Sequence, residues 1–378
     1  MEVEMEDAIW RRLPEKLIER VVAMLPVVSF MRLRAVCKHW YGLMFSDSFL
    51  EVCREVRQGR PCFLLFKMGV WTQGFLYDPS SQERSWLRMS LPFIPPGFTV
   101  AASSGGLLCC VPDQPGCKTI FLCNPLTQSF SLLPSTLKER FVPSVGLLVD
   151  GHTQSYKLVV AGDDLISPFA VKNLSTEVLD SACPEWKMSG ALPRLCSLES
   201  GKMTYSDGFF YCMNYSPFSV LAYDIRRGVW SKIEAPMRRF LRAPSLVECR
   251  GRLVLVAAVR KSKLNVPKSI RMWGLHHSRN GWVELERMPQ TLYDQFITLS
   301  DEDSFSCIAH GNLILITMTK SPEMLMYDFY DKIWSWVPHC PFVDRGEGLQ
   351  GFPFDPRLEA SPTAMEKRSA LAPSISNF

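Results

Sequence analysis

One pair of features recurs six times along the chain and constrains its fold more than any other feature. A short apolar run ends in a turn, and an aromatic residue follows a few positions later. The turns begin at Tyr77, Asn124, Leu179, Tyr223, Trp273 and Tyr327, and the aromatic residues are Trp86, Phe130, Trp186, Trp230, Trp282 and Trp334. Successive aromatic residues are 44, 56, 44, 52 and 52 positions apart. Among short strands, a period near 50 predicts one four-stranded propeller blade per repeat.

The residues beyond Arg60 support a fold built only from strands. Apolar runs of four to eight residues alternate with clusters of Gly, Pro, Asn, Asp and Ser, which is typical of strands and turns. Glycines mark the tight turn before the second strand of several repeats, at Gly105-Gly106, Gly208, Gly251 and Gly311. We expect the recurring ring to fill the wedge between neighbouring blades. The period indicates an all-β six-bladed kelch-type propeller over residues 61–357, and the alternative is an irregular β-sandwich with incidental tryptophan spacing.

The first and last repeats are incomplete in complementary ways. No strand precedes the apolar run at Cys62, while residues 348–354 remain after the sixth repeat is complete. We expect this C-terminal stretch to supply the innermost strand of the first blade, because closure removes an exposed sheet edge. We also expect flexible residues 1–8 and a disordered, polar tail at residues 358–378.

Residues 9–56 have a helical period instead. Apolar residues at positions 17, 18, 21, 22 and 25 predict a helix that Pro26 ends, and a second stripe from Leu33 to Met44 predicts another. Ser46 or Asp47 begins a third helix. Three short helices form a very small core, yet their apolar stripes are broad. The bundle is therefore either a cap packed on the following domain or a module whose surplus apolar surface binds another protein.

The same residues resemble an F-box. Leu-Pro pairs occur at Leu13 and Leu25, and residues 34–40 read Arg-x-Val-Cys-Lys-x-Trp. Together with the repeats, this makes the chain similar to the plant F-box/kelch family over nearly its whole length. The repeats depart from the family pattern, because consecutive glycines occur in one repeat only and Phe130 replaces a tryptophan.

The resemblance implies binding to a Skp-type adaptor and, through it, to a cullin ubiquitin ligase. It assigns the adaptor contact to Leu13, Pro14, Ile18, Leu25, Pro26, Val36, Cys37 and Trp40. Some of these residues, Trp40 above all, are equally compatible with a place in the bundle's own core.

Positive charge is concentrated in one segment. The chain has a net charge of +4, but residues 224–271 contain 13 Lys and Arg against 3 Asp and Glu, so the rest carries −6. In a four-stranded meander, the loop entering a blade and the loop between its second and third strands emerge on one face. This predicts a basic patch in the fifth blade, formed by Arg238, Arg239, Phe240, Arg242, Arg260, Lys261, Lys263 and Lys268.

The basic patch has three interpretations. It is a solvated surface, or it docks an acidic or phosphorylated segment of a client protein. The third is electrostatic contact with nucleic acid beside a transcription-factor client, without base recognition.

One stretch of the sequence matches a cofactor-binding motif, but the residues around it do not fit that function, and other catalytic or metal-binding motifs are missing. Gly346, Gly348 and Gly351 match a dinucleotide fingerprint, but Pro353 and Pro356 prevent the helix that it needs. The chain has no C-x-x-C pair and no H-E-x-x-H motif, so we expect no metal site and no cofactor. Its 13 cysteines, without a secretory leader, predict reduced thiols, and it has no apolar run long enough to span a membrane.

The sequence therefore predicts a non-catalytic receptor subunit of a ubiquitin ligase in the nucleus and/or cytoplasm. In this interpretation the F-box holds the adaptor and the propeller presents a client protein. The competing interpretation is a propeller enzyme or small-ligand-binding protein that uses the central channel.

Overall fold

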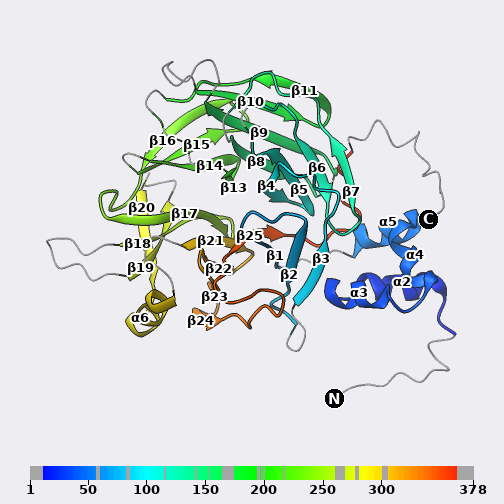
Figure 1. The fold of residues 1–378 in the computed structure, drawn as a ribbon. Helices are drawn as coiled ribbons and strands as arrows, with labels where there is room; N and C mark the ends of the chain where they lie inside the picture. The colour runs from blue at the N-terminus through cyan, green and yellow to red at the C-terminus, as the bar shows by residue number, and fades with distance from the viewer. Residues whose placement is uncertain are drawn as a thin grey trace.

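The chain forms a ring of β-sheets with a small helical domain beside it (Figure 1). The computed structural model describes residues 12–56, 60–81, 86–114, 116–140, 143–151, 153–163, 174–193, 196, 198, 201–215, 218–259, 269–276, 281–299 and 305–363. The flexible segment expected at residues 1–8 lies outside these ranges. None of the described helices is both long and apolar enough to cross a membrane.

The helical domain consists of short helices joined by tight turns. These are α2 (Glu15–Ala23), α3 (Val27–Leu33), α4 (Lys38–Gly42), the 3₁₀ helix η1 (Leu43–Phe45) and α5 (Asp47–Glu55). Pro14 and Pro26 occupy the N-cap positions of α2 and α3 with φ of −55° and −52°. Because proline lacks an N–H group, it starts a helix without losing a hydrogen bond.

The single helix predicted from Leu33 to Met44 is wrong. Helix α3 ends at Leu33, and the chain turns before α4 begins at Lys38. Cys37 is extended there, with φ of −157°, so the helical ladder cannot continue through it. The apolar residues keep a helical spacing across the turn between α3 and α4. Spacing alone therefore cannot show where one helix ends and the next begins.

The ring has six blades, as the aromatic period predicts. Blade 1 contains β1 (Cys62–Lys67), β2 (Gln73–Tyr77), β3 (Trp86–Ser90) and β25 (Leu349–Phe354). Blade 2 contains β4 (Phe98–Ser104), β5 (Leu107–Pro112), β6 (Phe121–Asn124) and β7 (Ser129–Leu132). Blade 3 contains β8 (Ser144–Val149), β9 (Tyr156–Asp163), β10 (Leu174–Asp180) and β11 (Cys183–Met188), with the additional short strand β12 (Gly201–Lys202).

The remaining three blades are meanders of four antiparallel strands. Blade 4 contains β13 (Thr204–Ser206), β14 (Phe209–Asn214), β15 (Ser219–Asp224) and β16 (Val229–Glu234). Blade 5 contains β17 (Leu241–Cys249), β18 (Arg252–Val259), β19 (Ser269–His276) and β20 (Gly281–Arg287), and blade 6 contains β21 (Phe305–His310), β22 (Leu313–Met318), β23 (Ser321–Asp328) and β24 (Ile333–Trp336). Helix α6 (Gln290–Leu299) connects blades 5 and 6.

Strand β25 closes the ring, as the leftover C-terminal stretch predicts. It pairs antiparallel with β1 over six residues, from Cys62 opposite Phe354 to Lys67 opposite Leu349. Blade 1 is therefore assembled from both ends of the propeller sequence, and β1 has a hydrogen-bonded neighbour on each side. Phe352 and Phe354 of β25 are almost fully buried in the core of blades 1 and 2.

The ordered chain continues beyond the boundary that the sequence predicts. We expected the disordered tail to begin at residue 358, but Leu358 packs against two apolar clusters and Ala360 is only 3% exposed. Tertiary contacts to segments more than 200 residues away stabilise this stretch, so its polar composition is a poor guide. Residues 364–378 lie outside the described part.

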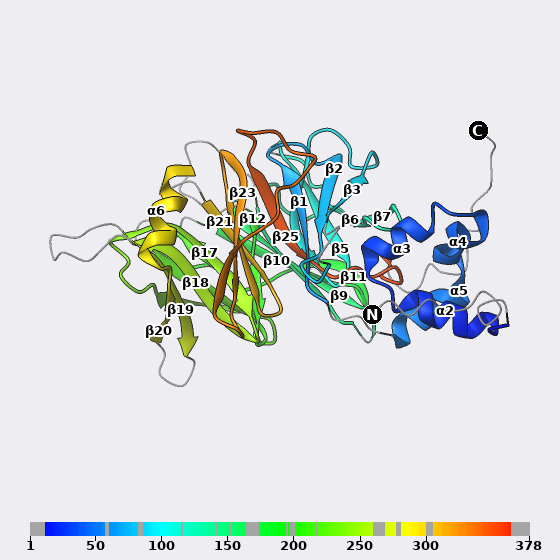
Figure 2. The same cartoon turned by 90° about the horizontal axis from the view of Figure 1, so that it is seen from below.

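The strand order gives the ring two different faces. The face that carries the turns between first and second strands and between third and fourth strands is called here the hairpin face. The opposite face, called the loop face, carries the connections between second and third strands and between blades. Helix α6 therefore lies on the loop face, beside the strands of blade 5 (Figure 2).

Candidate functional site

The helical domain has a compact core and a second apolar surface that the described chain leaves open. Its buried residues are Val22, Phe30, Leu43, Met44 and Phe49, and the Phe30 and Phe49 rings stack at 5.7 Å. Large apolar side chains nevertheless stay exposed on the same small domain, namely Leu17, Val21, Met24, Val36, Tyr41 and Phe45. We call these six residues the outward face. An apolar surface of this kind on a small module indicates a protein partner.

The residues predicted to bind the adaptor divide into two groups. Ile18, Leu25 and Trp40 are half-buried and pack on the domain core, so they fit the internal role that we weighed for them. Pro14, Val36 and Cys37 are exposed, with Val36 at 71%, whereas Leu13 and Pro26 are half-buried. The structure therefore brings Ile18, Leu25 and Trp40 together on the domain core and leaves Pro14, Val36 and Cys37 accessible.

Sequence reasoning missed most of the outward face. Helix α2 carries two apolar stripes, an inward one at Ile18, Val22 and Leu25 and an outward one at Leu17, Val21 and Met24. Both have the spacing of one helix face. A second apolar stripe on so short a helix is the signal that would have identified the missing contacts.

On the loop face, the structure describes four of the eight residues of the basic patch. Arg238 and Arg239 are exposed in the turn that enters blade 5, while Phe240 is half-buried against the core of blades 4 and 5. Arg238 donates to Glu234 at 2.9 Å, and this exposed pair neutralises part of the charge at little gain in stability. Arg242 is half-buried and donates to the Leu241 carbonyl at 2.9 Å.

The other half of the basic patch lies outside the described residues, namely Arg260, Lys261, Lys263 and Lys268. The ends of their loop are placed, because Val259 pairs with both Leu241 and Ser269. The loop therefore leaves blade 5 from the edge where the Arg238 turn enters it, as the meander argument requires. The basic residues of segment 224–271 are also divided between the two faces of the ring, since Arg226, Arg227 and Arg250 lie in turns of the hairpin face.

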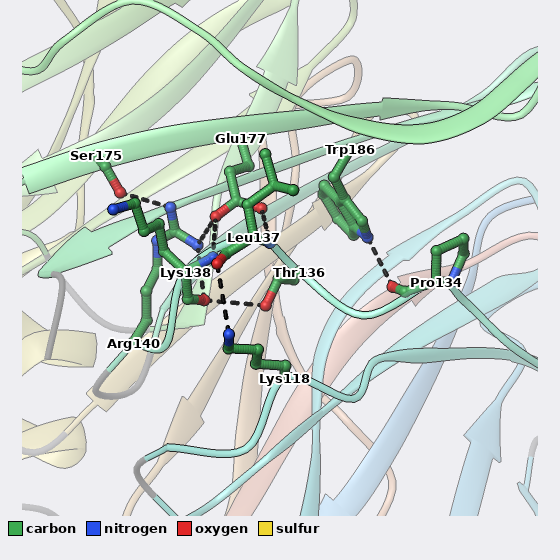
Figure 3. A network of polar contacts seen from close by, with 9 residues as sticks. All are labelled: Lys118, Pro134, Thr136, Leu137, Lys138, Arg140, Ser175, Glu177 and Trp186. Atoms are coloured by element: carbon green, nitrogen blue, oxygen red, sulfur yellow. Dashed lines mark hydrogen bonds and ion pairs between the residues drawn. The ribbon is translucent and has the colours of Figure 1, made fainter.

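A buried ion pair fixes another loop of the same face, between blades 2 and 3 (Figure 3). The Glu177 carboxylate is fully buried in β10 and accepts hydrogen bonds from Arg140 at 2.7 Å and from the backbone N–H groups of Leu137 and Lys138 at 2.7 and 2.8 Å. Arg140 also donates to Ser175 at 2.6 Å. Such charge-assisted bonds hold the loop in one conformation. The only signal in the sequence is a glutamate in the middle of a strand, which does not identify its partners.

The central channel is divided into two chambers. They measure about 300 and 280 Å³, near the lower limit for ligand pockets, and share Lys202, Thr204, Leu246 and Phe352. Lys202 lies on the unpredicted strand β12 and donates across the channel to the Cys307 carbonyl at 3.0 Å. This bond crosses the space that a ligand extending through the ring would occupy.

Two thiols of the described chain, one beside the core of the helical domain and one beside the central channel, are held protonated. Burial, together with nearby Glu359 and Glu19, raises the pKa of Cys53 to about 12, and burial raises the pKa of Cys307 to about 12. These thiols stay protonated near neutral pH and are poor nucleophiles. Within the described ranges, no three His, Cys, Asp or Glu residues are grouped so that they could hold a metal ion.

Known proteins share both parts of this architecture. Residues 10–51 match the F-box domain, and residues 76–328 match the KIB1-4 beta-propeller family. Protein UNUSUAL FLORAL ORGANS of Arabidopsis thaliana is 47% identical over 386 residues, covering 94% of this chain and 86% of that protein. The residues Ile9-Trp10 and the run from Cys37 to Tyr41 independently resemble that type.

Two further relatives extend the comparison. Protein ABERRANT PANICLE ORGANIZATION 1 of Oryza sativa subsp. indica is 41% identical over 406 residues, covering 98% of this chain and 93% of that protein. An F-box/kelch-repeat protein of Arabidopsis thaliana is 28% identical over 382 residues, covering 93% and 90%. The helical domain, the six-bladed ring and these similarities agree along the whole chain, which therefore belongs to the F-box/β-propeller family that includes Protein UNUSUAL FLORAL ORGANS.

Proposed function

We propose that this protein is the client-recognition subunit of a Skp-cullin-F-box ubiquitin ligase. The observation that carries the proposal is the outward face, because six large apolar side chains stay exposed on a domain that has already formed its own core. A Skp-type adaptor would bury them, and each large side chain that becomes fully buried contributes about 1.5–3 kcal/mol. The cullin then joins through the adaptor, so the chain itself needs no catalytic residue.

The propeller presents the client, and the loop face is the best candidate surface. Arg238 and Arg239 are exposed there, and the loop of residues 260–268, with four more basic residues, leaves blade 5 at the same edge. This charge suits an acidic or phosphorylated segment, including one of a transcription factor. We place the complex in the nucleus and/or cytoplasm, where its thiols stay reduced, and regard direct contact with nucleic acid as the weaker possibility.

Co-purification with a Skp-type adaptor tests the adaptor half of the proposal. Val21→Asp places a carboxylate between Leu17 and Met24 in the exposed stripe of α2 without touching the domain core, so we expect adaptor binding to be lost while the fold is kept. The variant Leu13→Ala/Pro14→Ala should also lose the adaptor, although Pro14 additionally begins α2. Ser48→Asp, an exposed site in the first turn of α5, is the matched control and should bind normally.

Normal adaptor binding by Val21→Asp, with the protein folded by circular dichroism, would contradict the proposal. Loss of binding in Ser48→Asp as well would mean that any added carboxylate disturbs the domain, and the outward face would then have no special role.

A further inference from the structure

Residues 355–360 follow β25 and contact both the ring and the helical domain. We call this segment the strap. At its start, the Asp355 carboxylate accepts from His310 of blade 6 at 3.0 Å and from the backbone N–H of Gly105 in blade 2. In its middle, Leu358 packs against the apolar core of blades 1 and 2 and also against the core of the helical domain. One side chain thus belongs to both cores.

Blade 2 holds the strap through one residue that differs from the residue at the same position of other blades. The residue that ends the third strand is an aspartate in four other blades, at Asp78, Asp180, Asp224 and Asp328. Each of these carboxylates accepts a hydrogen bond from the backbone N–H two residues later.

Asn124 replaces this aspartate in blade 2. Its Oδ1 makes the same turn, accepting from Leu126 N at 3.0 Å, while its Nδ2 donates to the carbonyls of Arg357 at 2.8 Å and Ala360 at 2.9 Å. An aspartate can form the turn but cannot donate to the two carbonyls. Asn124 is fully buried, so these donors have no alternative partner in water.

The strap also packs closely on the hairpin face. Gly106, with φ of +86°, lies against it so tightly that an added Cβ would be 2.8 Å from Arg357 Cβ and 3.1 Å from the Asp355 carbonyl. Only a glycine combines this backbone conformation with this approach.

Direct contact between the two domains comes from helix α3 and borders a cavity. Val27 and Val28 of α3 pack into the core of blades 1 and 2. Beside them is a cavity of about 290 Å³, lined by Val22, Phe30 and Phe49 of the helical domain and by residues of the ring and the strap. This junction is less closely packed than a protein core, and the strap, which lines the same cavity, adds contacts to both domains there.

We propose that the strap is an interdomain clamp, docked on Asn124 and inserting Leu358 between the cores, which fixes the orientation of the F-box relative to the propeller. It would thereby set the distance and the orientation between an adaptor bound to the F-box and a client on the ring. The clamp is a property of this chain alone, so it does not depend on the identity of either partner.

The variant Asn124→Asp tests the clamp on the full chain. It keeps the shape of the side chain and the turn to Leu126, but it places a carboxylate against two carbonyls. We expect hydrogen exchange at residues 355–360 and in α3 to become about tenfold faster or more. Small-angle X-ray scattering should show a wider range of domain separations, with adaptor binding unchanged.

Asp224→Asn is the matched control, because it makes the reverse change at the same position of blade 4, which is not in contact with the strap. It should leave exchange of the strap and scattering as in the original protein. Leu358→Ser removes the shared apolar contact without touching the turn, and we expect the same effects as for Asn124→Asp.

Asn124→Asp and Leu358→Ser together test whether the strap is a clamp, even if Asn124→Asp also loosens blade 2. The clamp is supported if Leu358→Ser frees α3 from the ring while exchange of β5 and β6 is unchanged. It is overturned if Leu358→Ser leaves exchange in α3 and the scattering profile the same as in the original protein.

Discussion

At the scale of single residues, the recurring tryptophan bonds to the neighbouring blade as well as filling space. The indole N–H donates to a backbone carbonyl of the preceding blade's exit in three blades, from Trp86 to Pro338, from Trp186 to Pro134 and from Trp282 to Glu234, at 2.7–3.0 Å. In two of these bonds, the acceptor is the proline that follows the aromatic residue of the preceding blade. Phe130 has no N–H and instead stacks on Phe93, with 6.2 Å between the ring centroids.

Glu177→Gln should destabilise the propeller strongly. The change removes the charge that compensates Arg140, whose side chain is only 3% exposed, and it turns amide hydrogens toward N–H donors. Breaking a buried ion pair by removing one partner costs about 3–5 kcal/mol. Urea unfolding measures this loss, and Glu139→Gln, at an exposed neighbouring site, should change stability by less than about 0.5 kcal/mol. Equal effects of the two variants would show that the network contributes nothing special.

His310 should give the ring closure a dependence on pH. Burial alone lowers the pKa of His310, but Asp355, the Cys62 carbonyl and Glu248 together raise it above its ordinary value. Burial raises the pKa of Asp355, but His310, Arg357 and the Gly105 N–H together hold it below its ordinary value.

The direction in which stability changes with pH follows from the protons that the folded and unfolded states bind. The stabilisation from protonated His310 is complete below about pH 6.5 and is lost as the pH rises through its raised pKa, while that from Asp355 is lost only in acid, below about pH 4. The Tm difference between the original protein and His310→Asn should therefore be largest at about pH 5–6 and smaller at about pH 8. His339→Asn, at an exposed histidine, is the control. A difference that stays constant with pH would exclude this role for His310.

At the scale of elements, the sequence predicts the turns and the period of the ring, but it misses a turn within the helical domain and most contacts between distant segments. The turns at Tyr77 and Tyr223, the glycine hairpins and the aromatic period each depend on a few adjacent residues, and together they predict six blades and the closing strand. Strand β12 was missed because two residues that pair in parallel with β8 have no periodicity. The Glu177 network and the ordered strap were missed because their partners are distant in sequence.

Removing residues 347–378 should destroy the closure of the ring. Without β25, the backbone groups of β1 along Cys62–Lys67 lose their partners on one side, and Phe352 and Phe354 no longer fill the core of blade 1. We expect oligomers in size-exclusion chromatography and loss of the cooperative thermal transition, because a free edge strand pairs with other chains. Removing residues 364–378 alone is the control and should leave a monomer-sized peak and the Tm unchanged. A cooperative, unaggregated chain without β25 would contradict the closure argument.

At the scale of the whole molecule, the two surfaces proposed for the adaptor and the client are separated by the sheets themselves. The helical domain meets the ring at the hairpin face, since Ser104, Gly105 and Val149 line the cavity between them. The Arg238 turn and the loop held by Glu177 belong to the opposite face. A client held on the loop face therefore does not compete with the F-box for the same surface, and changes on either face should affect one partner only.

Charge reversal on the loop face should separate the two activities. In the variant Arg238→Glu, Arg239→Glu, Arg260→Glu and Lys261→Glu, we expect the adaptor to co-purify normally, while clients identified by affinity mass spectrometry under proteasome inhibition are lost. Clients that remain should dissociate at lower salt than before, because fewer ionic contacts hold them. The matched control is Arg226→Glu and Arg227→Glu, which adds negative charge on the hairpin face. An unchanged client set would show that the basic patch is solvated surface, and equal loss in both variants would show that net charge, not position, governs binding.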